Sequence, residues 1–561
     1  MLDVTIEHDV PATMRDGVVL RADVYRPTAD GPWPVLLARL PYGKNQPMLA
    51  GLMDPVGRAR RGFLVVVQDT RGRYASDGEW EPWTYEMDDG YDTVRWAAAL
   101  PGSNGSVGMF GPSYLGNTQW MAALAKPPEL KAISPMVTWS EPDDGLFARG
   151  GAQELGITVP WSLMQGVDTL LRRYAGDPMA QGQALMALVG DTDAVAHTTY
   201  WELPAGHHPV FERHGIPELG FERSRREPEW SDSCRVAGRQ AEIDLPSLHT
   251  GGWYDIFSQG TLDNFTAMRA AGRPANLIMG PWSHTGTMGY LGDVNFGMAA
   301  STELLGFRGR FADLELGWLR RWLSPGDEPS QPELPPVLLF VMGTNQWREE
   351  QEWPLARAVD TDLFLRAGNR LAFDAPETEE ETGAFTYDSA DPVPTTGGAL
   401  LMSNEFPPGP LDQAKIEARP DVLLYTTDPL ADDLEVTGRV RAHLTAATDA
   451  PTTDWVVRLC DVDTRGVSRN VVDGIVRAVA TPGEFTEQVV DLWSTSYVFR
   501  AGHRIRVHVT SSNFPRWDRN LNTGEPLGTQ SRPARQVIAH DASRLSRVVL
   551  PVVPAPAEGR A

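Results

Sequence analysis

The chain has 561 residues and a formal net charge of −24, with 42% hydrophobic and 22% charged residues. One hydrophobic core does not support a chain of this length, so we expect two or three domains. The negative charge argues against nucleic acid or an anionic membrane as a partner, because both are bound through positive charge. No apolar run approaches the roughly 20 residues that a membrane span needs.

The first residues and the cysteines indicate a cytoplasmic location. Met1 to His8 contain neither a basic segment nor an apolar run of the kind that a secretory signal peptide carries. Cys234 and Cys460 are the only cysteines, which is too few for a disulfide framework or a thiolate metal site.

Strand-like and helix-like segments alternate over residues 1–144. Residues 18–25 alternate at period two, whereas residues 34–38 and 63–68 are continuous apolar runs typical of buried parallel strands. Residues 88–100 have acidic side chains in their first turn, which predicts a helix. This alternation predicts a doubly wound, mostly parallel sheet.

The segment from Gly105 to Trp120 predicts a nucleophile elbow. It reads as a short apolar strand, the serine Ser113 between Gly111 and Gly116, and the start of a helix. A serine hydroxyl is a weak nucleophile, so it must stand on a sharp turn where a base and a carbonyl can both reach it. The general pattern has glycine two residues after the serine, but this chain has Leu115 there and glycine one place later.

Residues 145–241 predict a helical cap inserted into the sheet domain. They include helical stretches such as residues 178–188, several prolines, and three histidines, His207, His208 and His214. These histidines lack the His-Glu-x-x-His spacing, so we expect loop or surface roles for them and no metal site.

The sheet resumes at Leu245, and two apolar runs end in polar residues. One run ends at Asp255 and the other at His284. The order serine, acid, histidine is that of the α/β-hydrolase fold, which predicts Ser113, Asp255 and His284 as a catalytic triad. A helix is expected over residues 303–323, and the hydrolase domain is expected to comprise residues 1–144 and 242–353.

Beyond residue 354 the hydrophobic pattern changes to period two. Short strand-like segments separated by Asp, Pro and Gly turns occur at residues 422–425, 434–444, 455–459 and 503–509. We expect residues 354–561 to form an all-β jelly roll.

The triad predicts acyl transfer through a covalent intermediate. Ser113 would attack an ester or amide carbonyl, His284 would take and return the proton, and Asp255 would orient the imidazole. The backbone N–H of Tyr114, which follows the nucleophile, would donate to the oxyanion. No glycine-rich phosphate loop or dinucleotide fingerprint occurs in a strand-to-helix context, so no cofactor is implied.

Four ordered blocks resemble the cocaine esterase/NonD hydrolases of the X-Pro dipeptidyl-peptidase superfamily. The blocks are Gln68 to Arg73, Gly108 to Gly116, Gly252 to Asp255 and Gly280 to His284. The resemblance covers nearly the whole chain and implies a small-molecule ester or amide substrate, a C-terminal jelly roll and a homodimer.

The resemblance also assigns further site residues. It implies that the phenolic O–H of Tyr42 is the second oxyanion donor, and that Trp161 and Phe257 are aromatic walls of an acyl pocket. Each of the three could instead be an ordinary core aromatic, and that interpretation stays open for them.

The presence or absence of ammonium-binding carboxylates distinguishes the activities found among the related enzymes. The α-amino-acid ester hydrolases hold an ammonium group with three carboxylates, but two of the corresponding positions here are Phe257 and Ser258, leaving Asp144 alone. The same lack weakens, without excluding, dipeptidyl-peptidase activity, which needs a site for a free amino terminus. The sequence is also compatible with an acyltransferase that uses the same acyl-enzyme and, more distantly, with a non-catalytic binding protein.

Overall fold

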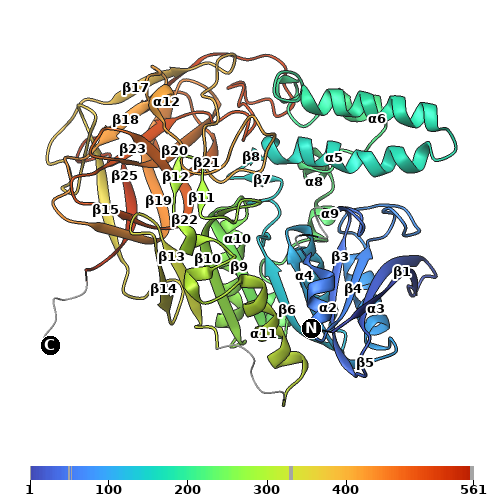
Figure 1. Ribbon diagram of the computed structural model, residues 1–561. Helices are drawn as coiled ribbons and strands as arrows, with labels where there is room; N and C mark the ends of the chain where they lie inside the picture. The colour runs from blue at the N-terminus through green and yellow to red at the C-terminus, as the bar shows by residue number, and fades with distance from the viewer. Residues whose placement is uncertain (1, 48–50, 52, 327–332, 556–561) are drawn as a thin grey trace, which may run out of the picture.

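The computed structural model describes residues 2–47, 51, 53–326 and 333–555. Within these residues, one ten-stranded sheet lies in the N-terminal part and one eleven-stranded sheet in the C-terminal part. Figure 1 shows the two parts side by side, with a pair of long helices extending outward from the region where they meet. Of the helices described, none combines the length and the apolar character that crossing a bilayer requires.

The ten-stranded sheet has the order β1-β2-β4-β3-β5-β6-β9-β10-β13-β14. Its strands from β4 to β13 run parallel, and antiparallel pairs lie at both edges. The strands are β1 (Val4–Thr13), β2 (Val19–Pro27), β3 (Trp33–Leu40), β4 (Leu64–Asp69), β5 (Ser103–Pro112), β6 (Leu130–Met136), β9 (Ser247–Tyr254), β10 (Ala275–Ser283), β13 (Val337–Val341) and β14 (Gln346–Glu350).

Helices cover both faces of this sheet. Val35 and Leu37 of β3 pack in one core with α3 (Glu86–Ala98), α4 (Tyr114–Ala125) and α10 (Ser258–Ala270). Leu36 and Ala38 point to the other core, with α2 (Pro55–Arg60) and α11 (Phe311–Leu323). Because successive side chains of a strand point to opposite faces, a strand buried on both sides is continuously apolar. The predicted α/β-hydrolase sheet is confirmed.

The helix expected over residues 303–323 is shorter than predicted. Residues Leu305–Phe307 form only a 3-10 turn, η4, and α11 begins at Phe311. Gly306 has φ 67° and Gly309 has φ 118°, values that no right-handed helix contains. The two glycines therefore break the pattern before α11 begins.

The inserted region contains five α-helices among the described residues. They are α5 (Leu155–Arg173), α6 (Pro178–Asp193), α7 (Pro209–His214), α8 (Phe221–Arg226) and α9 (Pro228–Asp232), with the 3-10 turns η1 (Thr199–Trp201) and η2 (Gln240–Glu242) and the short strands β7 (Ala148–Arg149) and β8 (Ala152–Gln153). Figure 1 shows α5 and α6 as an antiparallel pair. Leu163 and Leu170 of α5 share a buried cluster with Leu188 of α6 and with Phe514 of the C-terminal part.

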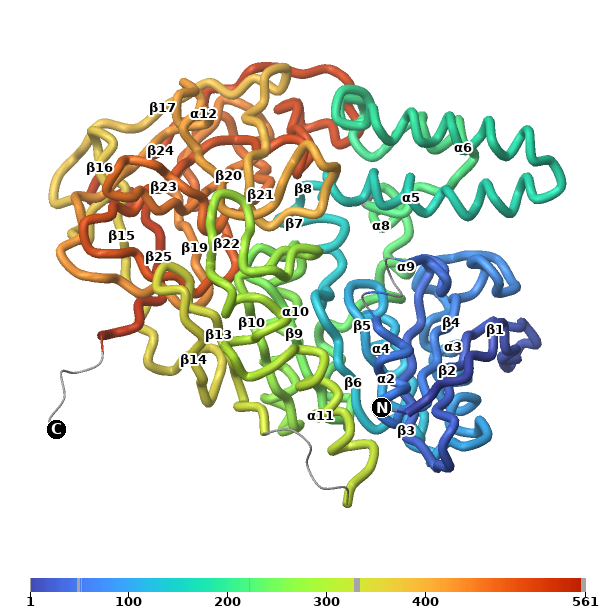
Figure 2. Tube along the Cα trace, viewed as in Figure 1, coloured from blue at the N-terminus to red at the C-terminus, as the bar shows by residue number. Residues whose placement is uncertain are grey.

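The C-terminal sheet is formed by strands that come late in the chain, shown from yellow to red in Figure 2. Its order is β17-β24-β19-β25-β15-β16-β18-β23-β20-β21, and β22 pairs with β19. The strands are β15 (Val359–Arg366), β16 (Arg370–Ala372), β17 (Gly383–Tyr387), β18 (Leu423–Thr426), β19 (Leu434–Thr448), β20 (Thr452–Val462), β21 (Ser468–Val479), β22 (Thr486–Phe499), β23 (Arg504–Thr510), β24 (Ala534–Ile538) and β25 (Arg547–Val553). One short helix, α12 (Ala414–Glu417), and two small elements before α11, the hairpin β11 (Tyr290–Leu291) with β12 (Val294–Asn295) and η3 (Met298–Ala300), complete the chain as described.

Candidate active site

Ser113 stands on a sharp turn between β5 and α4. Its backbone has φ 59° and ψ −122°, a conformation that a non-glycine residue rarely adopts. The turn is held by the Ser113 N–H, which donates to the carbonyl of Met136 at 2.9 Å, and by the Ser113 carbonyl, which accepts from the N–H of Gly116 at 2.8 Å. Such a strained turn at the end of a strand is typical of a nucleophile elbow.

The structure explains why the elbow has Leu115 and then Gly116. Leu115 is buried in the core on one face of the sheet, and a Cβ atom at Gly111 would lie 2.7 Å from its Cδ2 atom. A Cβ atom at Gly116 would lie 2.7 Å from Cβ of Thr138. The close approach that requires glycine therefore falls one residue later than in the general pattern.

Asp255 and His284 form a buried pair. The Nδ1 atom of His284 lies 2.7 Å from Oδ1 of Asp255, and the backbone N–H of Phe257 donates to Oδ2 of the same carboxylate at 3.2 Å. Asp255 is fully buried and the His284 side chain is 8% exposed. Because a carboxylate only accepts hydrogen bonds, the pair places a proton on Nδ1 and leaves Nε2 free to act as a base.

The sheet topology brings the predicted triad residues to one edge. Ser113 follows β5, Asp255 follows β9 and His284 follows β10, and the sheet order β5-β6-β9-β10 makes the last two strands neighbours. Parallel strands present their carboxyl ends at the same edge, where ligands bind in this class of sheet. Ser113 and His284 both line one cavity of about 740 Å³.

Two tyrosines border the same cavity where oxyanion donors are expected. Tyr42 comes two residues after β3, the neighbour of β5, and its hydroxyl accepts from Nε1 of Trp161 at 3.3 Å. Burial raises the pKa of Tyr42 to about 12, although hydrogen bonding with Trp161 and Ser113 opposes this shift. Tyr114 is the first residue of α4, and the first N–H groups of a helix have no partner inside the helix.

The cavity walls are mostly apolar and include several aromatic rings. Trp161 and Phe257, both expected from the resemblance, line it. The Phe257 ring meets the His284 ring edge-on with centroids 5.3 Å apart, and the Trp161 ring stacks on Trp83 with centroids 5.5 Å apart. The apolar lining residues that were not predicted from the sequence include Trp83, Trp139, Phe147 and Leu401. The sequence carried no signal for them, because they lie in turns and short segments without a regular period.

The side chain of Tyr114 braces this aromatic wall. Its hydroxyl accepts from the N–H of Trp83 at 3.0 Å and donates to Oε1 of Glu86 at 2.9 Å. Glu86 is buried and pairs with Arg39 at 2.7 Å, and burial raises the pKa of the Glu86 carboxyl. The residue that supplies the expected backbone donor is thus also fixed through its ring.

The cavity lining contains no Asp, Glu, Lys or Arg side chain among the described residues. Asp144, the one carboxylate that the sequence offered for an ammonium group, is exposed and accepts from the N–H of Gly150 at 3.2 Å. Ser258 begins helix α10 and does not line the cavity. No carboxylate clamp therefore lies beside Ser113 in the part of the chain that the structure describes.

The three cap histidines pair with different carboxylates. His207 lies 4.0 Å from Glu212, His208 3.7 Å from Glu202, and His214 2.7 Å from Asp191. Across residues 2–47, 51, 53–326 and 333–555, no three His, Cys, Asp or Glu side chains gather as a metal site would require.

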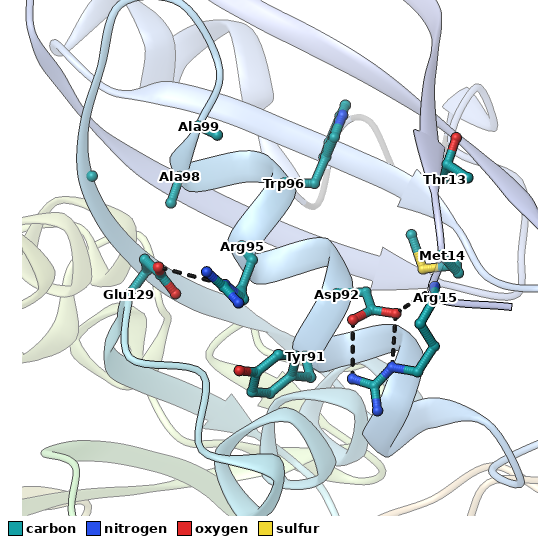
Figure 3. A pocket seen from close by; sticks show the side chains of 11 residues that line it. Thr13, Met14, Arg15, Tyr91, Asp92, Arg95, Trp96, Ala98, Ala99 and Glu129 are labelled. Carbon is teal, nitrogen blue, oxygen red and sulfur yellow. Dashed lines mark hydrogen bonds and ion pairs between the residues drawn. The ribbon is translucent and has the colours of Figure 1, made fainter. Parts of the chain in front are cut away.

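A second hollow lies along α3 and the end of β1, with a volume of about 600 Å³. Figure 3 shows that its charged side chains are already paired, Arg15 with Asp92 and Arg95 with Glu129. None of the triad candidates lines it, so this second hollow is not part of the candidate active site.

Comparisons with known proteins agree with this arrangement. The family profile described as X-Pro dipeptidyl-peptidase (S15 family) matches residues 16–286, and that of the X-Pro dipeptidyl-peptidase C-terminal non-catalytic domain matches residues 332–549. The chain is 35% identical to the cocaine esterase of Rhodococcus sp. (strain MB1 Bresler), over 98% of this chain and 99% of that protein.

Two solved structures share the fold over nearly the full length. An aminopeptidase from a marine sediment Thaumarchaeota archaeon superposes with a TM-score of 0.78 at 24% identity, covering 99% of this chain and 97% of that one. An α-amino acid ester hydrolase gives a TM-score of 0.78 at 23% identity, covering 98% and 97%. The chain therefore belongs to the cocaine esterase/NonD family within the X-Pro dipeptidyl-peptidase superfamily and is a serine hydrolase of carboxylesterase type.

Proposed function

We propose that the protein hydrolyses carboxylic esters of small molecules whose acyl group is uncharged and largely apolar. The observation that carries the proposal is the cavity lining: among the described residues, Ser113 and His284 open into a space walled by aromatic rings and free of charged Asp, Glu, Lys and Arg side chains. An apolar acyl group would be stabilised there by burial, whereas an ammonium group would lose its water without gaining a partner.

In the proposed reaction Ser113 attacks the carbonyl carbon while Nε2 of His284 takes the hydroxyl proton. Asp255 holds the imidazole in that tautomer, and the Tyr42 hydroxyl with the Tyr114 N–H stabilises the oxyanion. His284 then protonates the leaving alcohol, and water attacks the acyl-enzyme by the same route. Trp161 and Phe257 are proposed to contact the acyl group, since both line the cavity and Phe257 touches the His284 ring.

A substrate panel tests this proposal. We expect p-nitrophenyl benzoate and butanoate to be hydrolysed with kcat/KM at least about 100-fold above that of the p-nitrophenyl ester of an α-amino acid, because the ammonium group has no carboxylate partner. Gly-Pro-p-nitroanilide, a dipeptidyl-peptidase substrate, should be turned over still more slowly. A preference for the α-amino ester, or for the anilide, would contradict the proposal.

Acyl transfer would use the same acyl-enzyme. Product analysis with added alcohols and amines separates the two outcomes: free acid as the sole product supports a hydrolase, whereas new esters or amides at low nucleophile concentration would favour an acyltransferase. We further propose a cytoplasmic location, supported by the two buried free thiols of Cys234 and Cys460, and a homodimer, supported by family likeness alone.

A further inference from the structure

Two buried hydrogen-bond donors of the cavity lining have no partner among the described residues and no part in the proposed mechanism: Nε2 of Gln165 and the ring Nε1 of Trp83. The Gln165 amide differs from the Trp83 ring in that a charged neighbour, Arg73, fixes its orientation. Gln165 of helix α5 lines the cavity and is only 1% exposed. Its Nε2 atom has no hydrogen-bond partner among the described residues. A buried amide N–H without a partner is unfavourable, so such a group indicates that something else accepts from it.

The orientation of this amide is fixed by Arg73. The Nη2 atom of Arg73 donates to Oε1 of Gln165 at 3.0 Å, and Nη1 donates to the Gln165 backbone carbonyl at 3.2 Å. A guanidinium group has donors and no acceptor, so the amide oxygen must face it. The amide cannot turn over without bringing two donors together, and its NH2 group is therefore directed away from Arg73.

The Arg73 side chain is itself fixed by three further contacts. Its Nε atom donates to the carbonyl of Pro41 at 2.9 Å, Asp168 lies 3.5 Å from Nη1, and the guanidinium stacks over the Trp80 ring at 4.2 Å. Arg73 is 1% exposed. Because the Arg73 guanidinium is buried and fixed by these contacts, the Gln165 amide that binds it is also held in one orientation.

The position of Gln165 relates the donor to the reacting carbonyl. Gln165 follows Trp161 by four residues in α5, so the two side chains lie on the same helix face about 6 Å apart along the axis. Nε1 of Trp161 contacts the hydroxyl of Tyr42, the proposed oxyanion donor. Gln165 and the oxyanion candidate Tyr42 thus line the same cavity, whose walls are otherwise mostly apolar.

We infer that Gln165 is a specificity-determining residue that binds an uncharged acceptor oxygen of the substrate. The oxygen belongs to an ether, hydroxyl or second carbonyl group of the ester, apart from the scissile carbonyl. This inference rests on the proposed ester hydrolysis and narrows its substrate class from apolar esters to esters that carry one further acceptor oxygen.

Matched ester series test the inference. The first series compares p-nitrophenyl octanoate with isosteres in which an ether oxygen replaces one methylene at each chain position in turn, and the second makes the same replacements in the alcohol of octyl butanoate. Each kcat/KM is divided by the hydroxide-catalysed rate, which removes the inductive effect of the oxygen. We expect one oxygen position to raise the normalised kcat/KM about tenfold over the alkyl ester, the effect of one buried hydrogen bond.

Two variants and a control assign the preference to the amide. Gln165→Glu keeps an acceptor for Arg73 but removes the NH2 donor, and Gln165→Met removes both. Gln181→Glu is the matched control, because Gln181 lies in the neighbouring helix α6, donates to the Leu171 carbonyl at 3.0 Å and does not line the cavity. The ratio of the normalised kcat/KM of the preferred ether ester to that of the alkyl ester should fall to about one in both Gln165 variants. In the control variant this ratio should stay as in the native protein.

The outcomes separate this inference from the proposed function. Turnover of the alkyl esters with no preferred oxygen position, or a preference that survives in both Gln165 variants, would overturn the role of Gln165 and leave ester hydrolysis intact. Absence of turnover for every ester of both series would overturn both.

Discussion

A phenol serves as an oxyanion donor only while it keeps its proton. Burial raises the pKa of Tyr42 to about 12, so this side chain stays protonated across the range in which an esterase works. The sequence alone offered Tyr42 only through family resemblance, because nothing in its local pattern distinguishes a donor from a core tyrosine. Its hydrogen bond with Trp161 and its place beside Ser113 in the cavity support the donor role.

Replacing Tyr42 with phenylalanine should lower kcat by about 10² to 10³, because one preorganised donor to the oxyanion is lost. KM should change little, since the donor acts on charge that develops only in the transition state. Steady-state kinetics of Tyr42→Phe against Tyr290→Phe, a tyrosine that is 63% exposed, checks this. A fall in kcat of less than about threefold would remove Tyr42 from the mechanism.

The same side chain sets an expectation for alkaline pH. A donor phenol is active when protonated, so its contribution is present below its pKa and lost as pH rises through that value. With the pKa of Tyr42 raised to about 12, kcat/KM should show no decline from this group between pH 8 and pH 10. A decline centred near pH 10 that is absent from Tyr42→Phe would contradict the buried donor.

At the scale of the element, local patterns predicted the parts of the site that follow strands. Ser113, Asp255 and His284 each end an apolar run, and the structure places each directly after a parallel strand. The helix expected from residue 303 failed because Gly306 and Gly309 adopt positive φ values, which a hydrophobic pattern does not report. The hydrophobic pattern therefore predicted the ends of these strands more accurately than the start of helix α11.

Two helical glycines should respond oppositely to alanine. Gly116 in α4 would place a Cβ atom 2.7 Å from Thr138, whereas Gly182 in α6 has nothing within 4 Å. We expect Gly116→Ala to destabilise the protein by about 1–3 kcal/mol through overpacking, and Gly182→Ala to stabilise it by about 0.5–1 kcal/mol through helix propensity. Urea unfolding of both variants measures the difference, and equal effects would refute this account of the elbow.

At the scale of the whole molecule, the cap and the C-terminal part are joined by buried charges. Arg149, before the cap helices, donates to the carbonyl of Asp473 at 2.7 Å, and Arg516 pairs with the Asp473 carboxylate at 2.7 Å. Glu154 accepts from Nε1 of Trp517 at 2.8 Å. These groups fix the base of α5, the helix that carries Trp161 and Gln165 to the cavity.

Removing one member of this buried network should lower the free energy of unfolding far more than removing one ion pair at the surface. Arg516→Met leaves the buried Asp473 carboxylate short of its partner, and we expect a loss of about 3–5 kcal/mol in unfolding free energy. Arg465→Met, which removes an exposed pair with Asp463, should cost less than about 1 kcal/mol. Denaturant unfolding monitored by tryptophan fluorescence checks both, and comparable losses would argue against the network.

The lining of the cavity is the part of the candidate site that could not be predicted from the sequence. The sheet, the C-terminal β domain and three polar strand ends follow from period and order, which act over neighbouring residues. Trp83, Phe147, Gln165 and Leu401 come from a loop, the cap and the C-terminal part, and only the folded chain brings them together. The expected domain boundaries at residues 144, 241 and 353 stay a prediction, which limited proteolysis can test.

The central claim is that Ser113 is an activated nucleophile, and intact mass after exposure to a fluorophosphonate tests it most directly. The native protein should gain the mass of one adduct, and Ser113→Ala should gain none, because only a serine deprotonated by His284 attacks the reagent. An unmodified native protein, or an adduct of equal extent on Ser113→Ala, would contradict the assignment of the triad.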